Sequence, residues 1–184
     1  SVQNAIDFPP SGITGNIIEM HYHPFKRLIY ALHWDDMEQM EYLISINPQT
    51  GELIKIDSIP EVYLIQSDFS ALNYKNNEYS FIGVDYENNY RLFTLDVNSG
   101  NVLYQPITPS NNINGGLNEL EINSIRGSLH SLHYDQVDNK EYFVTINKET
   151  GEVTKLDSIP GVQYIQSGFS AINPQNGEYY FHGI

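Results

Sequence analysis

The chain has no cysteine and little positive charge. Its 184 residues include one tryptophan, and 9 Lys and Arg stand against 23 Asp and Glu, for a net charge of -14. Without cysteine there is no disulfide framework, thiolate metal site, iron–sulfur cluster or cysteine nucleophile. Nucleic-acid binding needs clustered Lys and Arg to neutralise phosphates, so this charge balance argues against a nucleic-acid partner.

Long apolar runs are also absent. No stretch approaches the roughly 18 apolar residues of a membrane-spanning helix, so we predict no membrane insertion. No basic, apolar signal peptide stands at the N-terminus. No window carries a long apolar stripe with the helical period, which predicts almost no helix. With 40% hydrophobic and 12% aromatic residues, the chain can still bury a core of ordinary size.

A repeat of 100 residues organises the sequence. The segment 41–73 recurs without a gap at 141–173. Between Leu32 and Gly83, 28 of 52 residues are identical to those 100 positions later. Self-similarity at a fixed period is the signature of a repeat architecture.

Each unit of the repeat divides again. A turn that ends at Gly51 is echoed at Gly100 and Gly151, in steps of 49 and 51 residues. About 40 to 50 residues with four short strands is typical of one β-propeller blade. In the first unit we expect strands at 17–22, 28–34, 42–46 and 53–56, because β-branched and aromatic residues alternate there with turn residues.

The predicted fold is therefore an all-β propeller of four-stranded antiparallel blades, forming a single domain over 1–184. The repeat units are 1–100 and 101–184. The expected blades cover about 14–60, 61–110 and 111–160, and 161–184 together with 1–10 would form a partial fourth blade.

The hairpin around Asn47-Pro48-Gln49-Thr50-Gly51 carries a family resemblance. An Asp/Asn-x-x-Thr-Gly turn between two strands resembles the repeats of quinoprotein-like and YVTN-type β-propellers. The resemblance implies the fold alone. Lys55, Gln105 and Lys155 stand near the place of the tryptophan of quinone-binding repeats, so no quinone cofactor is implied.

The fourth blade is incomplete in this count. A lone outer strand is expected around Val2 to Ile6, and the sequence stops 16 residues short of a second full unit. An exposed sheet edge is usually avoided or covered. We therefore expect either a longer propeller of six or eight blades, or another chain that completes the fourth blade.

An aromatic residue beside an aspartate recurs where the second strand of each blade ends. The candidate ligand-binding residues are these pairs: Trp34 with Asp35, Asp85 with Tyr86, and Tyr134 with Asp135. Aromatic faces stack on sugar rings while carboxylates accept hydroxyl hydrogen bonds. The alternative interpretation is that each aromatic merely covers the edge of its blade.

Two other candidates have simpler explanations. The acidic loops at 35–38, 85–88 and 135–138 have oxygen ligands of the kind Ca²⁺ prefers, but not the spacing of a known calcium loop. His33 and His133 alternate with Gly83 and Gly183 at the half-period, which favours blade packing over a metal pair or catalytic bases. We predict no catalytic residue, no metal site and no cofactor, with Ca²⁺ as the one ion to consider.

The expected function is a non-catalytic binding or scaffold propeller that recognises a carbohydrate or a protein at one rim. One alternative is a polysaccharide hydrolase or lyase with carboxylates at the channel mouth. Another is a purely structural array of blades. The lack of cysteine, the many Tyr and Asn residues, and the resemblance to exported bacterial propellers favour a secreted or cell-surface protein of bacterial origin.

Overall fold

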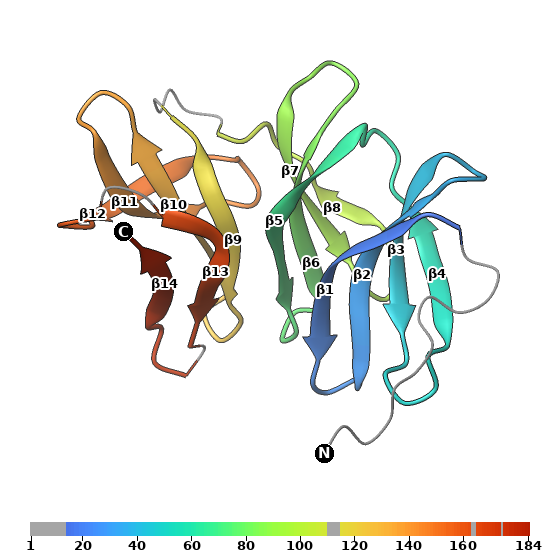
Figure 1. Ribbon diagram of the computed structural model, residues 1–184. Coiled ribbons are helices and arrows are strands. Elements are labelled where there is room, and N and C mark those ends of the chain that lie inside the picture. Colours follow the sequence, from blue (N-terminus) through green and yellow to red (C-terminus); the bar gives the residue numbers. More distant parts are fainter. Residues whose placement is uncertain (1–13, 110–114, 163–164, 174) are drawn as a thin grey trace.

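The computed structural model describes residues 14–109, 115–162, 165–173 and 175–184, and every regular element in these ranges is a β-strand. Three four-stranded antiparallel sheets and one two-stranded sheet follow each other along the chain (Figure 1). This confirms the predicted all-β class and its antiparallel sheets of four strands. The first sheet contains β1 (Asn16–His23), β2 (Leu28–Asp35), β3 (Met40–Ile46) and β4 (Leu53–Ser58); the second β5 (Leu64–Asn73), β6 (Glu78–Val84), β7 (Tyr90–Asp96) and β8 (Val102–Tyr104); the third β9 (Leu117–Asn123), β10 (Ser128–Asp135), β11 (Lys140–Ile146) and β12 (Val153–Ser158); and the last β13 (Ile165–Ile172) and β14 (Tyr179–Gly183).

Turn residues set the ends of these strands. In the turn before β4, the amide of Gly51 donates to the carbonyl of Asn47 at 2.8 Å, and Gly51 has a φ of 74°. Glycine adopts this left-handed backbone without steric cost. The four strands expected in the first unit all lie within observed strands, which extend one or two residues further. The strand expected around Val2 to Ile6 lies outside the described residues.

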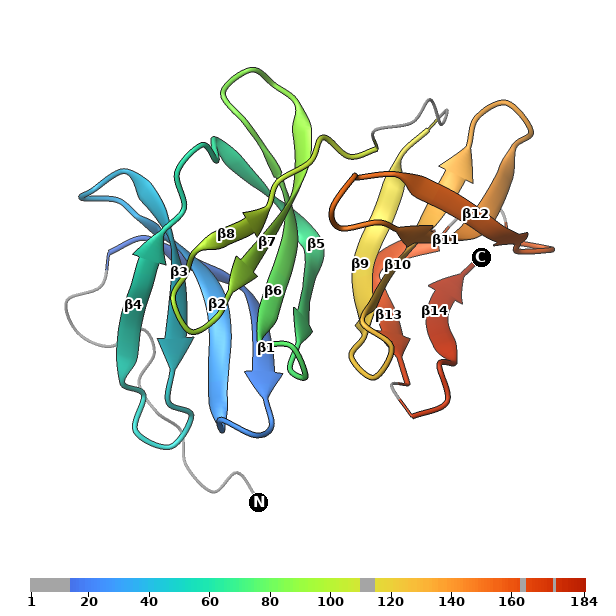
Figure 2. The same ribbon diagram turned by 180° about the vertical axis from the view of Figure 1, so that it is seen from behind.

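The first strands of the four sheets lie side by side along the inside of the molecule: β1 beside β5, β5 beside β9, and β9 beside β13 (Figure 1). The strands β4, β8 and β12 form the outer edges (Figure 2). Each inner strand slips register against its neighbour. In three of them an acidic residue with a positive φ stands at the slip: Glu19, Asp68 and Glu119. These β-bulges bend the inner strands where they approach the axis.

Apolar layers join each sheet to the next. Between the first and second sheets, Leu32 and Leu43 pack with Phe81, Phe93 and their neighbours, and all four side chains are fully buried. A second layer, which includes Ile82, Leu92, Leu129 and Val144, joins the second sheet to the third. Both faces of a strand are thus apolar because each face meets a different sheet.

The sheets are of two kinds that alternate along the chain, and they differ in where a large side chain stands on the second strand. Residues two apart on a strand share a face. In one kind of sheet the smaller residue of such a pair comes first in the sequence, and in the other kind the larger residue comes first. The small and large partners are Ala31 and His33, Gly83 and Phe81, Ser131 and His133, and Gly183 and Phe181. A Cβ on Gly83 would lie 3.2 Å from the ring of Phe93 and 3.3 Å from that of Phe81.

The matching histidines are part of this packing. His33 and His133 are fully buried. Nδ1 of His33 donates to the carbonyl of Asn16 at 3.1 Å, and Nδ1 of His133 donates to that of Gly116 at 2.9 Å. Each ring therefore ties the second strand of its sheet to the beginning of the inner strand.

This alternation predicts a specific double-mutant result. We expect Gly83→His to destabilise the protein by about 1–3 kcal/mol, because the new ring overlaps Phe81 and Phe93. The double variant Phe81→Ala/Gly83→His should lose less than the sum of the two single losses, since it recreates the Ala31 and His33 pair. Urea denaturation of the four proteins measures the coupling. Additive losses of stability would contradict the idea that the large side chain can stand at either position 81 or position 83.

Candidate functional site

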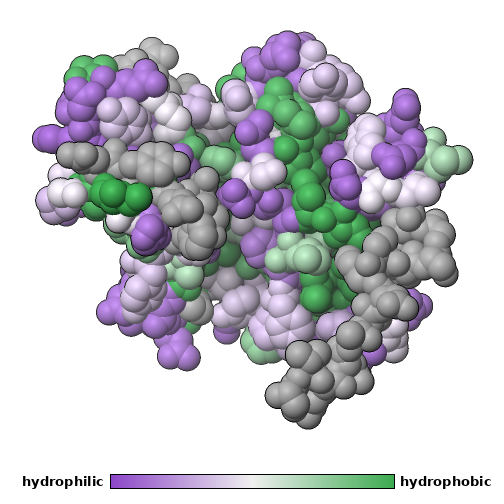
Figure 3. Space-filling model, in the orientation of Figure 1, coloured by the Kyte–Doolittle hydropathy of each residue, from purple (hydrophilic) through white to green (hydrophobic). Residues whose placement is uncertain are grey.

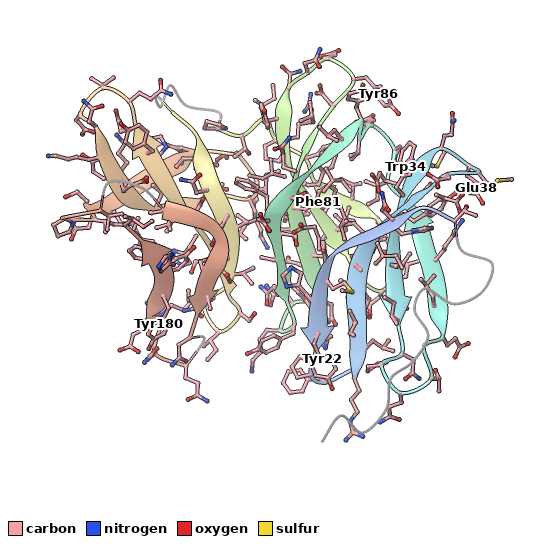
Figure 4. The ribbon with its side chains drawn as sticks, viewed as in Figure 1. Tyr22, Trp34, Glu38, Phe81, Tyr86 and Tyr180 are labelled. Atoms are coloured by element: carbon pink, nitrogen blue, oxygen red, sulfur yellow. The ribbon has the colours of Figure 1, made fainter. Side chains whose placement is uncertain are left out.

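The six predicted residues lie at one end of the sheets. Figure 4 shows Trp34, Glu38 and Tyr86 at the end opposite to Tyr22 and Tyr180. We call this end the loop rim: it carries the loops that join the second and third strands of each sheet, at 36–39, 85–89 and 136–139. Trp34 and Asp35 are the last residues of β2, Asp85 and Tyr86 follow β6, and Tyr134 and Asp135 end β10. Each pair thus belongs to a different sheet.

The aspartates are buried and organise their own loops. Oδ1 of Asp35 accepts hydrogen bonds from the amides of Met37 and Glu38 at 2.8 and 3.0 Å, and its Oδ2 accepts one from Lys55 at 2.6 Å. Asp135 repeats this with the amides of Val137 and Asp138 and with Lys155.

The second sheet varies the same arrangement. Asp85 accepts from the amides of Glu87 and Asn89 at 2.9 Å each, and from Nε of Arg91 at 2.6 Å. A loop tied to a carboxylate, which is in turn tied to a cation, has little conformational freedom.

These contacts lower the pKa of all three carboxyl groups. The hydrogen bond from Lys55 is the largest cause for Asp35, Arg91 is for Asp85, and Lys155 is for Asp135; each pKa falls from 3.8 to about 2. The folded state therefore binds fewer protons than the unfolded chain at acidic pH. Their contribution to stability is complete above about pH 4 and is lost as the pH falls toward 2.

The aromatic partners differ in exposure. Tyr86 is 72% exposed, and its ring lies 5.9 Å from that of Tyr63, measured between centroids. Trp34 and Tyr134 are half-buried, and the hydroxyl of Tyr134 donates to Asn139 at 3.0 Å. Of the three aromatic residues, Tyr86 has the most surface free to meet a ligand.

A cleft of about 560 Å³ opens at the loop rim between the second and third sheets. It combines the rings of Phe69 and Tyr90 with the carboxylate of Asp68 and several amide side chains. Its full lining is Gln66, Ser67, Asp68, Phe69, Ile82, Tyr90, Thr108, Pro109, Gly115, Gly116, Leu117, Asn118 and Gln136. Aromatic faces beside amide and carboxylate groups suit a ligand with both apolar faces and many hydroxyls.

A second hollow, of about 310 Å³, lies on the axis and shares Asp68 with the cleft. Four carboxylates converge here: Glu19, Asp68, Glu119 and Glu121. The carboxylate of Glu19 accepts from the amide of Asp68 at 2.8 Å and from the hydroxyl of Ser70 at 2.6 Å. Three of these acids stand at the bulges of the inner strands, so bulge geometry gathers the negative charge.

Two acidic residues of the hollow have no acidic counterpart across the 100-residue repeat: Asp68 corresponds to Gly168, and Glu121 corresponds to His21. His21 lies 2.7 Å from the hydroxyl of Ser70, whereas Glu121, its counterpart, accepts a 3.2 Å hydrogen bond from Ser170. Burial is the largest cause of both pKa shifts. It lowers the pKa of His21 to about 4 and raises that of Glu121 to about 7, and the nearby Glu119 adds to the rise.

The cleft was not predicted from the sequence. Its walls come from two sheets, because Gln66 and Asp68 belong to the second sheet whereas Asn118 and Gln136 belong to the third. The match of Glu19 to Glu119 across the repeat was the available signal for the axial acids.

Within the ranges that the structure describes, no three His, Asp or Glu side chains are placed to hold one metal ion together. No helix in those ranges has the length and apolar character needed to cross a membrane.

Adjacent aspartates provide a test of the loop anchors. Asp35→Asn should lower the melting temperature at neutral pH because it removes the ion pair with Lys55, whereas Asp36→Asn, at an exposed site in the same loop, should not. The difference between Asp35→Asn and the wild type should shrink as the pH falls from about 4 to about 2. Thermal melts across that range decide the matter; a difference that stays constant would refute the role given to Asp35.

Comparison with known proteins bears on the fold. No protein-family model matches the chain, and no curated protein sequence does. Among solved structures, a chain of a nidogen/laminin complex aligns with a TM-score of 0.61 and 10% identity, over 92% of this chain and 57% of its own length. TolB from Acinetobacter baumannii aligns with a TM-score of 0.55 and 9% identity, over 92% of this chain and 44% of its own. The chain thus spans about half the length of these proteins, both of which are β-propellers, and the likeness confirms the predicted propeller fold.

Proposed function

We propose that the protein is a non-catalytic binding module whose loop rim holds a carbohydrate in the cleft between the second and third sheets. The observation that carries this proposal is the lining of the cleft, in which Tyr90 and Phe69 lie among Asp68, Gln66 and Asn118. Tyr90 is 52% exposed and can stack on a sugar ring, while the carboxylate and amides exchange hydrogen bonds with hydroxyls.

The residues predicted from the sequence take two roles in this proposal. Tyr86, Trp34 and Tyr134 extend the aromatic surface along the rim. Asp35, Asp85 and Asp135 hold the loops in place instead of meeting the ligand, because their oxygens already accept hydrogen bonds from Lys55, Arg91 and Lys155. A preformed rim lowers the entropy cost of binding.

Secretion or display on a bacterial surface is part of the same proposal. The absence of cysteine and the richness in Tyr and Asn support it. A carbohydrate-binding rim would meet its ligands in that location.

Binding to an array of neutral and acidic oligosaccharides tests the cleft. Tyr90→Ala should reduce the retained signal about tenfold or more, as expected for loss of a central aromatic contact, without changing the melting temperature. Tyr22→Ala is the matched control, because Tyr22 is 54% exposed at the opposite end. Equal binding by Tyr90→Ala and the wild type, or no retained glycan at all, would reject the proposal.

The second candidate function is a polysaccharide hydrolase or lyase at the axial hollow. Glu121 favours it, since its pKa of about 7 leaves a protonated carboxyl near neutral pH beside the carboxylates of Glu119 and Asp68. Such a pair of unlike carboxyl groups can act as general acid and base. Glu121 has no acidic counterpart in the first repeat unit, because position 21 is His.

A single variant separates the two functions. If the hollow is catalytic, polysaccharide incubated with the protein should release reducing ends or unsaturated products, and Glu121→Gln should abolish the release. If the protein only binds, neither protein releases anything. In both cases Glu121→Gln should be more stable than the wild type above pH 7, because the wild type must then hold a buried charge. Denaturation at pH 5 and 8 shows whether the variant is folded and whether the pKa assignment is right.

A further inference from the structure

Each loop of the rim presents an apolar side chain at its tip. Met37 is 81% exposed, and Tyr86 and Val137 are each 72% exposed. Between the first two sheets, Tyr63 and Leu64 are also exposed, and the ring of Tyr63 contacts that of Tyr86. We call these five residues the rim patch. Contiguous exposed apolar groups mark an interaction surface, and the contact between Tyr63 and Tyr86 makes the centre of the rim patch contiguous.

The tips are held outward by the fold. The amides of Met37 and Val137 donate to Asp35 and Asp135, and the amide of Glu87, next to Tyr86, donates to Asp85. A tip fixed in this way cannot turn its side chain into the core. The rim patch is therefore preorganised, which reduces the entropy cost of contact with a partner.

Negative charge surrounds the apolar tips. The loops 36–39, 85–89 and 136–139 contain no Lys or Arg, and the carboxylates of Asp36, Glu87 and Asp138 are exposed there, whereas the exposed Glu38 is already paired with Lys55. The nearby Lys55, Arg91 and Lys155 are already paired with the buried aspartates, and Lys140 follows the third loop. In the orientation of Figure 1, Figure 3 shows a hydrophobic stripe that runs up the middle of the molecule toward the loop rim.

At the opposite end, the cations gather in the turns between the first and second strands, while Glu52, Glu149 and Glu152 stand in the turns between the third and fourth. The turns 24–27, 74–77 and 124–127 contain Lys26, Arg27, Lys75 and Arg126 and no carboxylate. With a net charge of -14, the field of the whole molecule also favours the approach of a cation to the acidic end.

We propose that the rim patch binds a protein partner through a basic segment that alternates Lys or Arg with apolar side chains. The apolar residues of the partner contact Met37, Tyr86 and Val137, and its cations pair with the carboxylates around them. An anionic membrane surface does not fit, because these carboxylates would face negative headgroups. The lining of the carbohydrate cleft includes none of these five residues, and only Tyr86 is shared with the aromatic surface proposed to extend along the rim.

Labelled synthetic peptides test the chemistry of this surface by fluorescence anisotropy. A peptide of alternating Lys and Leu should bind more tightly than peptides of alternating Lys and Ser or Glu and Leu, and its affinity should fall as salt is added. The double variant Met37→Ser/Tyr86→Ser should weaken binding about tenfold. The control Tyr22→Ser/Phe25→Ser removes two exposed aromatic side chains from the other end and should bind as the wild type does.

Charge variants exclude a general attraction to an acidic protein. Asp36→Asn/Glu87→Gln should weaken binding and reduce its salt dependence, whereas Glu52→Gln/Glu149→Gln, an equal change in charge in the turns at the other end, should not. The proposal is overturned if the Lys and Ser peptide binds equally well, or if rim and control variants lose the same affinity. The variant Met37→Ser/Val137→Ser leaves Tyr86 in place and should weaken peptide binding while it retains oligosaccharides as the wild type does; loss of both would mean that the patch and the cleft are one site and would overturn the proposal.

Discussion

Burial of both faces of each sheet is the constraint on which this molecule depends. Exposure of Leu32 and Leu43 of the first sheet to water would be unfavourable. The fully buried rings of Phe81 and Phe93 in the second sheet cover them. The second sheet then uses Ile82 and Leu92 on its other face to reach the third. No sheet is complete by itself, so each stabilises the next in sequence, as nearest neighbours do in repeat proteins.

The stacked sheets leave their ends for function. Hairpins must cross from strand to strand there, and the buried aspartates let these loops be both rigid and exposed. At the axis, the same stacking gathers the bulges of Glu19, Asp68 and Glu119 in one hollow. The negative charge of the sequence is thus divided between structural carboxylates that anchor loops, axial carboxylates in a confined space, and solvated carboxylates at the loop tips.

Much of the fold could be predicted from the sequence because it depends on local patterns. Segments rich in β-branched and aromatic residues mark the strands, and glycine turns mark their ends. The 100-residue match of Glu41 to Glu141 reveals the repeat. The alternation of His33 with Gly83 also indicated packing. The cleft could not be predicted, since Asp68 and Asn118 belong to different sheets and meet only when these are stacked. The buried state of Asp35 was hidden for a similar reason, because its partner Lys55 lies two strands away.

The alternating bulk of neighbouring sheets restricts how such a protein can change in length. A sheet with Ala31 and His33 and one with Phe81 and Gly83 are distinct parts, so the unit of duplication or loss is the pair. Recombination in steps of about 100 residues keeps every sheet beside its proper neighbour. A step of about 50 residues would set the Ala31 and His33 pair against Leu32 and Leu43, in the place that Phe81 and Gly83 now occupy. The two long repeats share 28 of 52 residues between Leu32 and Gly83, far more than their halves share, and this is what inheritance in pairs would leave behind.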